Sequence, residues 1–182
     1  MHYTNPPELP HELVCLRPLS RADLPAWHAY LTMPHVLEHT SWQLRSIDDL
    51  QQKFDGLESA DPASELRFAI VLCSSGELVG SIGFHSLSLP NKTAEIAYDL
   101  APSVWGMGIA PSACAAMTGW AFERLGVVRV QATALDSNSR TLRVLEKCGF
   151  QREGLLRNFR MVRGEPRNFW IYAQLAPGLK PA

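Results

Sequence analysis

The chain of 182 residues lacks an excess of charge of either sign, a long apolar run and a cysteine framework. Its 17 lysines and arginines nearly balance its 18 aspartates and glutamates. This balance argues against nucleic acid as a partner, because proteins that bind it carry a marked basic excess. No stretch of about 18 apolar residues occurs, so we expect no transmembrane helix. The N-terminus lacks the basic and apolar segments of a secretory signal peptide.

The four cysteines are scattered and form no closely spaced pair. We therefore expect free thiols and a reducing, cytoplasmic compartment. Hydrophobic residues make up 46% of the chain and charged residues 19%, as in a folded globular protein. The length fits one domain over residues 1–182. Residues 1–11 are rich in proline and are expected to form a loose arm.

The hydrophobic pattern predicts a mixed α/β fold. Strands are expected at 12–19, 66–73, 78–87, 93–100 and 127–134, then from 150 and at 168–175. Helices are expected at 21–33, from 46 to about 57, from a glycine-rich turn at 105–110 to about 125, and at 138–148. Ser20 is the predicted N-cap of the first helix, and Pro34 its predicted end.

The glycine-rich turn Trp105-Gly-Met-Gly-Ile-Ala110 lies between an expected strand and an expected helix. Glycines let the backbone approach a ligand closely, and a helix start presents free N–H groups and a positive dipole end. This arrangement suits a pyrophosphate, although a plain tight turn has the same pattern. Pro111 at the third-glycine position excludes a dinucleotide-binding fingerprint, and the Gly-Lys-Ser/Thr of a Walker loop does not occur.

Two further motifs accompany this turn, Ala94-Glu-Ile-Ala-Tyr-Asp-Leu100 and the segment from Asn138 to Phe150. With these motifs the chain resembles the GCN5-related N-acetyltransferase (GNAT) superfamily, in particular its Rim-type branch of ribosomal-protein N-terminal acetyltransferases. The resemblance implies the GNAT fold, with a central mixed sheet of six to seven strands, a V-shaped splay between two strands and about four flanking helices. It also implies acetyl transfer from acetyl-CoA to a primary amine, without a metal.

The resemblance further implies which residues bind the cofactor. Backbone N–H groups of the turn would hold the pyrophosphate, and the backbone near Leu100 would hold the pantetheine arm. Asn138 resembles a residue that contacts this arm, and Thr141 stands where relatives have a serine near the leaving thiolate. The expected set is Leu100, Gly106, Met107, Gly108, Ile109, Ala110, Asn138 and Thr141. Pro111 has no N–H, which removes one phosphate contact.

Glu95 is the candidate general base, because it resembles the strand glutamate with that role in the Rim-type branch. A base must remove a proton when an amine attacks a thioester. Burial in an apolar strand is expected to raise the pKa of this carboxyl toward the working pH. The alternative is an edge-strand glutamate that faces solvent. Thr141 is the second catalytic candidate, since Leu145 occupies the position of a tyrosine acid found in many relatives.

The segment His35-Val-Leu-Glu-His39 matches a zinc-protease signature, but Pro34 directly before it opposes the long helix that such a site needs. In the resembled family this region lies beside the acceptor site. His35, His39 and Trp42 are therefore candidate acceptor-binding residues, with a polar surface loop as the alternative.

The C-terminal segment is basic, with Arg157, Arg160, Arg163 and Arg167. It indicates either a solvated hairpin or a rim that attracts an acidic acceptor or the CoA phosphates. The resemblance leaves the acceptor open between a protein N-terminal α-amine and a small-molecule amine, such as an amino acid, a polyamine or an aminoglycoside. Transfer of longer acyl groups, and a CoA-binding sensor without catalysis, are further hypotheses. A homodimer is expected from the resemblance alone.

Overall fold

The computed structural model describes residues 5–40, 44–57 and 65–178. Its centre is a seven-stranded sheet in the order β1-β2-β3-β4-β5-β7-β6. The strands are β1 (Val14–Pro18), β2 (Leu66–Leu72), β3 (Leu78–Ser88), β4 (Thr93–Leu100), β5 (Arg129–Leu135), β6 (Gln151–Val162) and β7 (Glu165–Leu175). Neighbours are antiparallel except β4 and β5, which run parallel. The mixed sheet predicted from the resemblance is confirmed.

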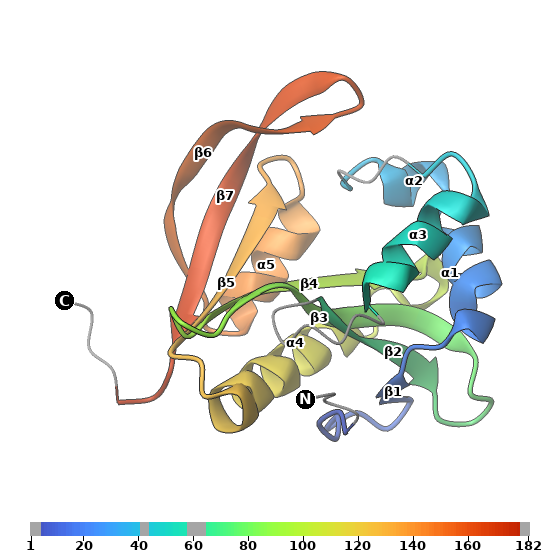
Figure 1. Ribbon diagram of the computed structural model, residues 1–182, viewed down its shortest axis with the longest axis horizontal. Helices are drawn as coiled ribbons and strands as arrows, with labels where there is room; N and C mark the ends of the chain where they lie inside the picture. The colour runs from blue at the N-terminus through green and yellow to red at the C-terminus, as the bar shows by residue number, and fades with distance from the viewer. Residues whose placement is uncertain (1–4, 41–43, 58–64, 179–182) are drawn as a thin grey trace.

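The strands β4 and β5 pair over a short distance and then separate. Their parallel ladder joins residues 93–95 to residues 129–131, whereas β4 continues to Leu100 and β5 to Leu135. Figure 1 shows the two arrows diverging from this point. The separation is the predicted V-shaped splay. It leaves backbone groups of both strands without a partner strand, so a ligand can pair with them.

Five α-helices flank the sheet: α1 (Leu24–Leu31), α2 (Pro34–Leu37), α3 (Ile47–Leu57), α4 (Ile109–Trp120) and α5 (Ser139–Lys147). The main core joins α4 and α5 to one face of the sheet, and a second core joins α1 and α3 to the other face. Within the described ranges, none of the helices is long and apolar enough to cross a membrane.

The first helix is shorter than its pattern predicted. Residues Arg21–Asp23 form a 3-10 turn, and α1 ends at Leu31. Pro34 does not stand in a loop but begins α2, because a proline at the first helical position has no N–H to leave unpaired. The helix that was predicted to run from the glycine-rich turn to about residue 125 does end there. A π-helical turn, Ala121–Leu125, extends α4, and Gly126 follows it with φ +64°.

Two segments carry more structure than the sequence indicated. The strand β7 begins at Glu165 rather than at residue 168, so the last hairpin is longer than expected. Residues 5–11 of the expected arm lie against the rest of the protein. Leu9 packs on the main core, and Nε2 of His11 is 3.0 Å from the carbonyl oxygen of Met107.

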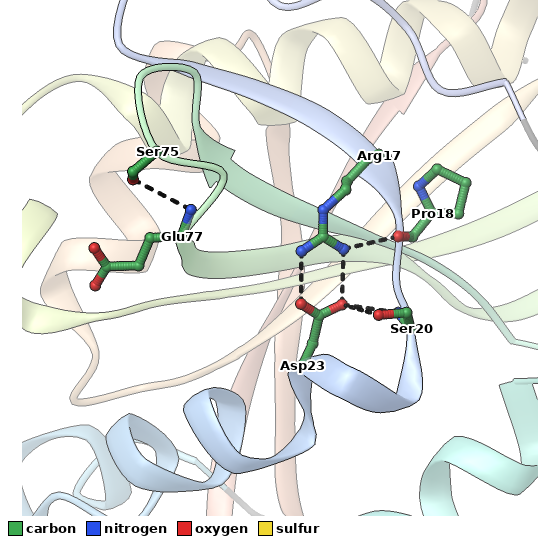
Figure 2. A network of polar contacts seen from close by, with 6 residues as sticks. All are labelled: Arg17, Pro18, Ser20, Asp23, Ser75 and Glu77. Carbon is green, nitrogen blue, oxygen red and sulfur yellow. Dashed lines mark hydrogen bonds and ion pairs between the residues drawn. The ribbon is translucent and has the colours of Figure 1, made fainter.

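A polar network, shown in Figure 2, ties β1 to the start of α1. The Asp23 carboxylate accepts two hydrogen bonds from the Arg17 guanidinium, at 2.6 and 2.7 Å. It also accepts hydrogen bonds from the backbone N–H and the hydroxyl of Ser20, at 2.8 and 2.9 Å. Ser20 therefore has the predicted N-cap position, as part of a capping box. The network holds α1 where it covers the sheet beside the splay.

Candidate active site

Glu95 lies at the branch point of the splay, as the last residue of β4 that pairs with β5. Its carboxylate is buried and accepts hydrogen bonds from two side chains of β5, Thr133 Oγ1 at 2.7 Å and Gln131 Nε2 at 3.2 Å. Two basic side chains complete its surroundings. Nε2 of His85 lies 3.2 Å from Oε1, and Nη2 of Arg160 lies 3.4 Å from the same atom. Glu95 is thus an enclosed side chain of a central strand, not a solvent-facing one of an edge strand.

His85 and Arg160 each lie at an irregularity of their own strand, β3 and β6. The register of β3 against β4 shifts between Phe84 and Ser86, which makes His85 an extra residue in β3. The register of β6 against β7 shifts just before Arg160. Bulges of this kind re-aim side chains. Sequence periodicity does not reveal them, so His85 was missed as a site residue, and Arg160 was expected only in a solvated hairpin or a basic rim.

The pKa of Glu95 is lowered to about 2, so the prediction that it would be raised is wrong. Burial does raise it, as expected, but hydrogen bonds from His85 and Thr133, the charge of His85 and a hydrogen bond from Gln131 outweigh burial. The carboxylate is therefore ionised at every physiological pH. A carboxylate with so low a pKa is a weak base, because a general base works best with a pKa near the working pH.

The glycine-rich turn forms an open loop with free donors. Gly106 and Gly108 have φ angles of +80° and +79°, and a Cβ built on either would meet nothing within 4 Å. Among the described residues, no hydrogen bond is donated by the backbone N–H groups of residues 106–110. The helix α4 begins at Ile109 and adds the positive end of its dipole. These donors fit the pyrophosphate of CoA.

The backbone of β4 beyond Glu95 faces the gap of the splay. The N–H of Ala101 donates to the carbonyl of Val79 at 2.8 Å, which sets the phase of the antiparallel ladder. Tyr98 and Leu100 therefore occupy non-hydrogen-bonded positions, with their backbone groups directed away from β3. The Leu100 carbonyl accepts a hydrogen bond from Trp105 Nε1 at 2.9 Å. The N–H groups of both residues remain available to a pantetheine arm.

The start of α5 contributes the two other predicted cofactor-binding side chains. Oδ1 of Asn138 accepts a hydrogen bond from the Thr141 N–H at 3.1 Å, so Asn138 caps α5 as predicted and keeps its amide NH₂ for a ligand. Burial raises the pKa of Tyr98 well above its ordinary value, while the neighbouring Thr141 hydroxyl lowers it by less. Tyr98 therefore stays protonated beside Thr141.

Trp105 links the cofactor loop to the helices on both sides of it. The guanidinium of Arg140 on α5 lies 4.4 Å from the Trp105 ring, and the His35 ring of α2 meets it edge-on at 5.4 Å. Of the other acceptor candidates, His39 has Nε2 at 3.9 Å from Glu38, and Trp42 lies outside the described residues. Within the described ranges, no three histidine, cysteine or acidic side chains are grouped to hold a metal.

Comparisons with known proteins agree with this geometry. A model of the acetyltransferase (GNAT) domain matches residues 14–151. The uncharacterised N-acetyltransferase YoaA of Bacillus subtilis is 27% identical over 175 residues, which are 94% of this chain and 98% of YoaA. The putative ribosomal N-acetyltransferase YdaF of the same organism is 36% identical over 104 residues, 57% of each chain.

Among solved structures, Mycobacterium smegmatis RimJ in complex with CoA-disulfide superposes with a TM-score of 0.85 and 28% identity. The superposition covers 100% of this chain and 93% of RimJ. Spermidine N-acetyltransferase from Vibrio cholerae, in complex with CoA and spermine, has a TM-score of 0.79 at 22% identity, over 90% and 95% of the two chains. This second likeness concerns the fold alone. Because the domain model spans most of the chain, the protein belongs to the GNAT family of acetyl-CoA-dependent acetyltransferases.

Proposed function

We propose that this enzyme acetylates the α-amine at the N-terminus of a polypeptide. The observation that carries the proposal is the Glu95 carboxylate at the branch point of the splay, where hydrogen bonds from Thr133 and Gln131 and the nearby His85 hold it and lower its pKa. So weak a base is poorly suited to an ammonium group of pKa about 10.4, as in a lysine or a polyamine. An α-amine, with a pKa of about 7.7–8.0, is partly neutral at pH 7 and therefore depends less on a strong base to remove its proton.

Two of the comparisons support this acceptor class. RimJ of M. smegmatis matches the whole length of this chain, and YdaF is named a putative ribosomal N-acetyltransferase. The likeness to spermidine N-acetyltransferase is weaker in sequence and carries no argument about the acceptor. A polypeptide N-terminus is therefore the better-supported acceptor of the two.

Each predicted cofactor residue has a role in this proposal. Acetyl-CoA supplies the thioester that the amine attacks. The free N–H groups of residues 106–110 hold its pyrophosphate, and the N–H groups of Tyr98 and Leu100 hold the pantetheine arm together with Asn138. The Thr141 hydroxyl donates a hydrogen bond to the leaving sulfur. This donor stands in for the tyrosine acid that Leu145 replaces.

On the acceptor side, Glu95 accepts a hydrogen bond from the incoming amine and orients it. This position matters because correct orientation of reactants lowers the barrier substantially. The proton that the amine loses passes through water to solvent, because Nε2 of His85 lies 3.2 Å from the Glu95 carboxylate and donates a hydrogen bond to it. Glu95 is thus the ion that positions both the amine and His85.

The test compares three acceptors in an assay of thiol release from acetyl-CoA. The first is a peptide with a free N-terminus and an internal lysine, the second is the same peptide with a blocked N-terminus, and the third is spermidine. We expect release with the first peptide alone, and mass spectrometry should place the acetyl group on its α-amine. Acetylation of the lysine or of spermidine instead would overturn the proposal. The proposal would also be overturned if none of the three acceptors caused thiol release while CoA still raised the melting temperature of the protein. That result would indicate a CoA-binding sensor without catalysis.

A further inference from the structure

The hairpin of β6 and β7 carries four arginines, Arg157, Arg160, Arg163 and Arg167, which we call the arginine rim. The segment from residue 154 to residue 170 contains these four arginines, a single acidic residue, Glu165, and no lysine. Figure 1 shows the hairpin rising beside the splay, with its tip turned toward α2. The Arg163 guanidinium donates a hydrogen bond to the Leu37 carbonyl of α2, which joins the tip to the helix.

The register places two members of the arginine rim, Arg160 and Arg167, on the face of the sheet that carries Glu95. Arg160 lies directly opposite Arg167, and Arg160 reaches Glu95 at 3.4 Å. Arg167 shares its face of β7 with Phe169, because side chains two residues apart lie on the same face of a strand. Phe169 packs with Leu135, on the face of β5 that contacts Glu95. By contrast, α4 and its cofactor loop pack against the opposite face. The rim therefore borders the acceptor side of the splay.

The charges of the rim are only partly compensated. Arg160 is shared with Glu95 and lies over the rings of Phe159 and Phe169, at 4.9 and 5.6 Å from their centres. Arg157 is exposed and Arg167 is half-buried, and neither side chain makes a hydrogen bond, ion pair or ring contact within the part of the chain that the structure describes. Two uncompensated cations thus remain on the hairpin, and Arg167 lies on the same face of the sheet as Glu95.

We propose, resting on the N-terminal acetylation argued above, that the preferred acceptor is a polypeptide with acidic residues directly after its first residue. With the α-amine at Glu95, an extended chain advances about 3.3 Å per residue, so its second to fourth residues pass along the hairpin. Carboxylates there would meet guanidinium groups, which bind them through paired hydrogen bonds. A polycation would be repelled by these guanidinium groups, and Glu95 itself is already paired with Arg160 and His85.

The test uses three peptides that share an N-terminal alanine and continue with three acidic residues, three serines or three lysines. Values of kcat/KM come from thiol release at low and high ionic strength. The enzymes are the wild type, the double variant Arg157→Gln with Arg167→Gln, and Arg124→Gln. The last is a matched control, because it removes one exposed arginine from the turn after α4, away from the hairpin. Melting temperatures verify that each variant is folded.

For the wild type we expect kcat/KM to be about tenfold higher for the acidic peptide than for the serine peptide, and lowest for the lysine peptide. High salt should shrink this preference, since it screens exposed charges. The double variant should lose most of the preference, and Arg124→Gln should keep it. Equal turnover of the three peptides, or an unchanged preference in the double variant, overturns this inference while N-terminal acetylation stands. Failure to acetylate any of the peptides, with turnover of spermidine, overturns the proposed function itself.

Discussion

Among single residues, Glu95 shows how neighbours can reverse the effect of burial. Burial alone raises the pKa of a carboxyl, and the apolar strand around Glu95 led to that expectation. The hydrogen bonds from Thr133 and Gln131 and the nearby His85 lower it instead. The resemblance to the Rim-type branch identified the residue, but its partners come from β3, β5 and β6. The ionisation state of such a side chain depends on the tertiary structure, which the local sequence does not contain.

The lowered pKa of Glu95 makes stability depend on pH in a defined range. Its folded-state pKa of about 2 is below the ordinary value of 4.5, so its contribution is present above pH 4.5 and is lost as the pH falls toward 2. In the Glu95→Gln variant this contribution is absent. We therefore expect its melting temperature to fall less over that pH range than that of the wild type. If the melting temperatures of the two proteins changed in parallel with pH, the native contacts of Glu95 would not favour its charged form.

His85 should support the site by holding the Glu95 carboxylate, because its Nε2 lies 3.2 Å from Oε1 of Glu95. We expect His85→Ala to lower kcat with an N-terminal peptide about tenfold, through loss of one hydrogen bond to the carboxylate that orients the amine. The affinity for acetyl-CoA should change little. His85→Gln keeps a hydrogen-bond donor and should retain most of the activity. An equal loss of kcat in both variants, or none in either, would contradict this role.

Among the elements, α1 is held to the sheet by the Asp99 carboxylate at the end of β4. Asp99 accepts hydrogen bonds from two side chains of α1, Trp27 Nε1 at 3.1 Å and the Tyr30 hydroxyl. It also accepts hydrogen bonds from Arg67 at 2.8 Å and from Ser81 at 2.6 Å. The Arg67 side chain is only 4% exposed. Asp99 therefore balances a buried charge and joins α1, β2 and β3 at one point.

Replacing Asp99 by alanine should destabilise the protein strongly, because Arg67 would lose its carboxylate partner while remaining buried. The expected cost is about 3–5 kcal/mol in the free energy of unfolding, measured by urea denaturation. The control is Asp55→Ala, which breaks an exposed ion pair with Arg21 and should cost less than about 1 kcal/mol. Similar costs for the two variants would contradict the role assigned to Asp99.

The N-terminal arm contacts the cofactor loop through one histidine. Nδ1 of His11 accepts a hydrogen bond from the Leu13 N–H at 3.3 Å, so Nε2 carries the proton and donates it to the Met107 carbonyl at 3.0 Å. We expect His11→Ala to raise the KM for acetyl-CoA about two- to tenfold through loss of one hydrogen bond, with kcat maintained. Glu12→Ala, at the exposed neighbouring position, is the control. An unchanged KM in His11→Ala would show that the arm does not position the loop.

The boundaries of most elements followed from apolar periodicity and from cap residues such as Ser20, Asn138 and Gly126. These signals are local, so they can be read along the chain. The helix α2 was missed because a proline can begin a helix as well as end one. The two strand irregularities near Glu95 were missed because a bulge becomes apparent only once two strands are paired. The cofactor loop was predictable, whereas the surroundings of Glu95 were not.

For the molecule as a whole, the splay joins two binding surfaces on opposite faces of one sheet. The cofactor loop opens α4, which packs on one face, and the arginine rim borders the other. Glu95 stands where β4 and β5 part, so a group held in the gap is reached from both sides. In the function proposed here, this division lets an acyl donor and an amine acceptor bind at once.

The most direct test of this account is the rate of acetyl transfer to an N-terminal peptide by the wild type and by Glu95→Gln, with acetyl-CoA affinity measured by calorimetry. We predict that the variant loses at least about 100-fold in kcat/KM for the peptide, because the amine is no longer oriented by a carboxylate. Its affinity for acetyl-CoA should stay close to that of the wild type, since the proposed cofactor site consists of residues 106–110 and the start of α5. Peptide turnover near the wild-type rate in Glu95→Gln would contradict the central claim that Glu95 binds and orients the acceptor amine.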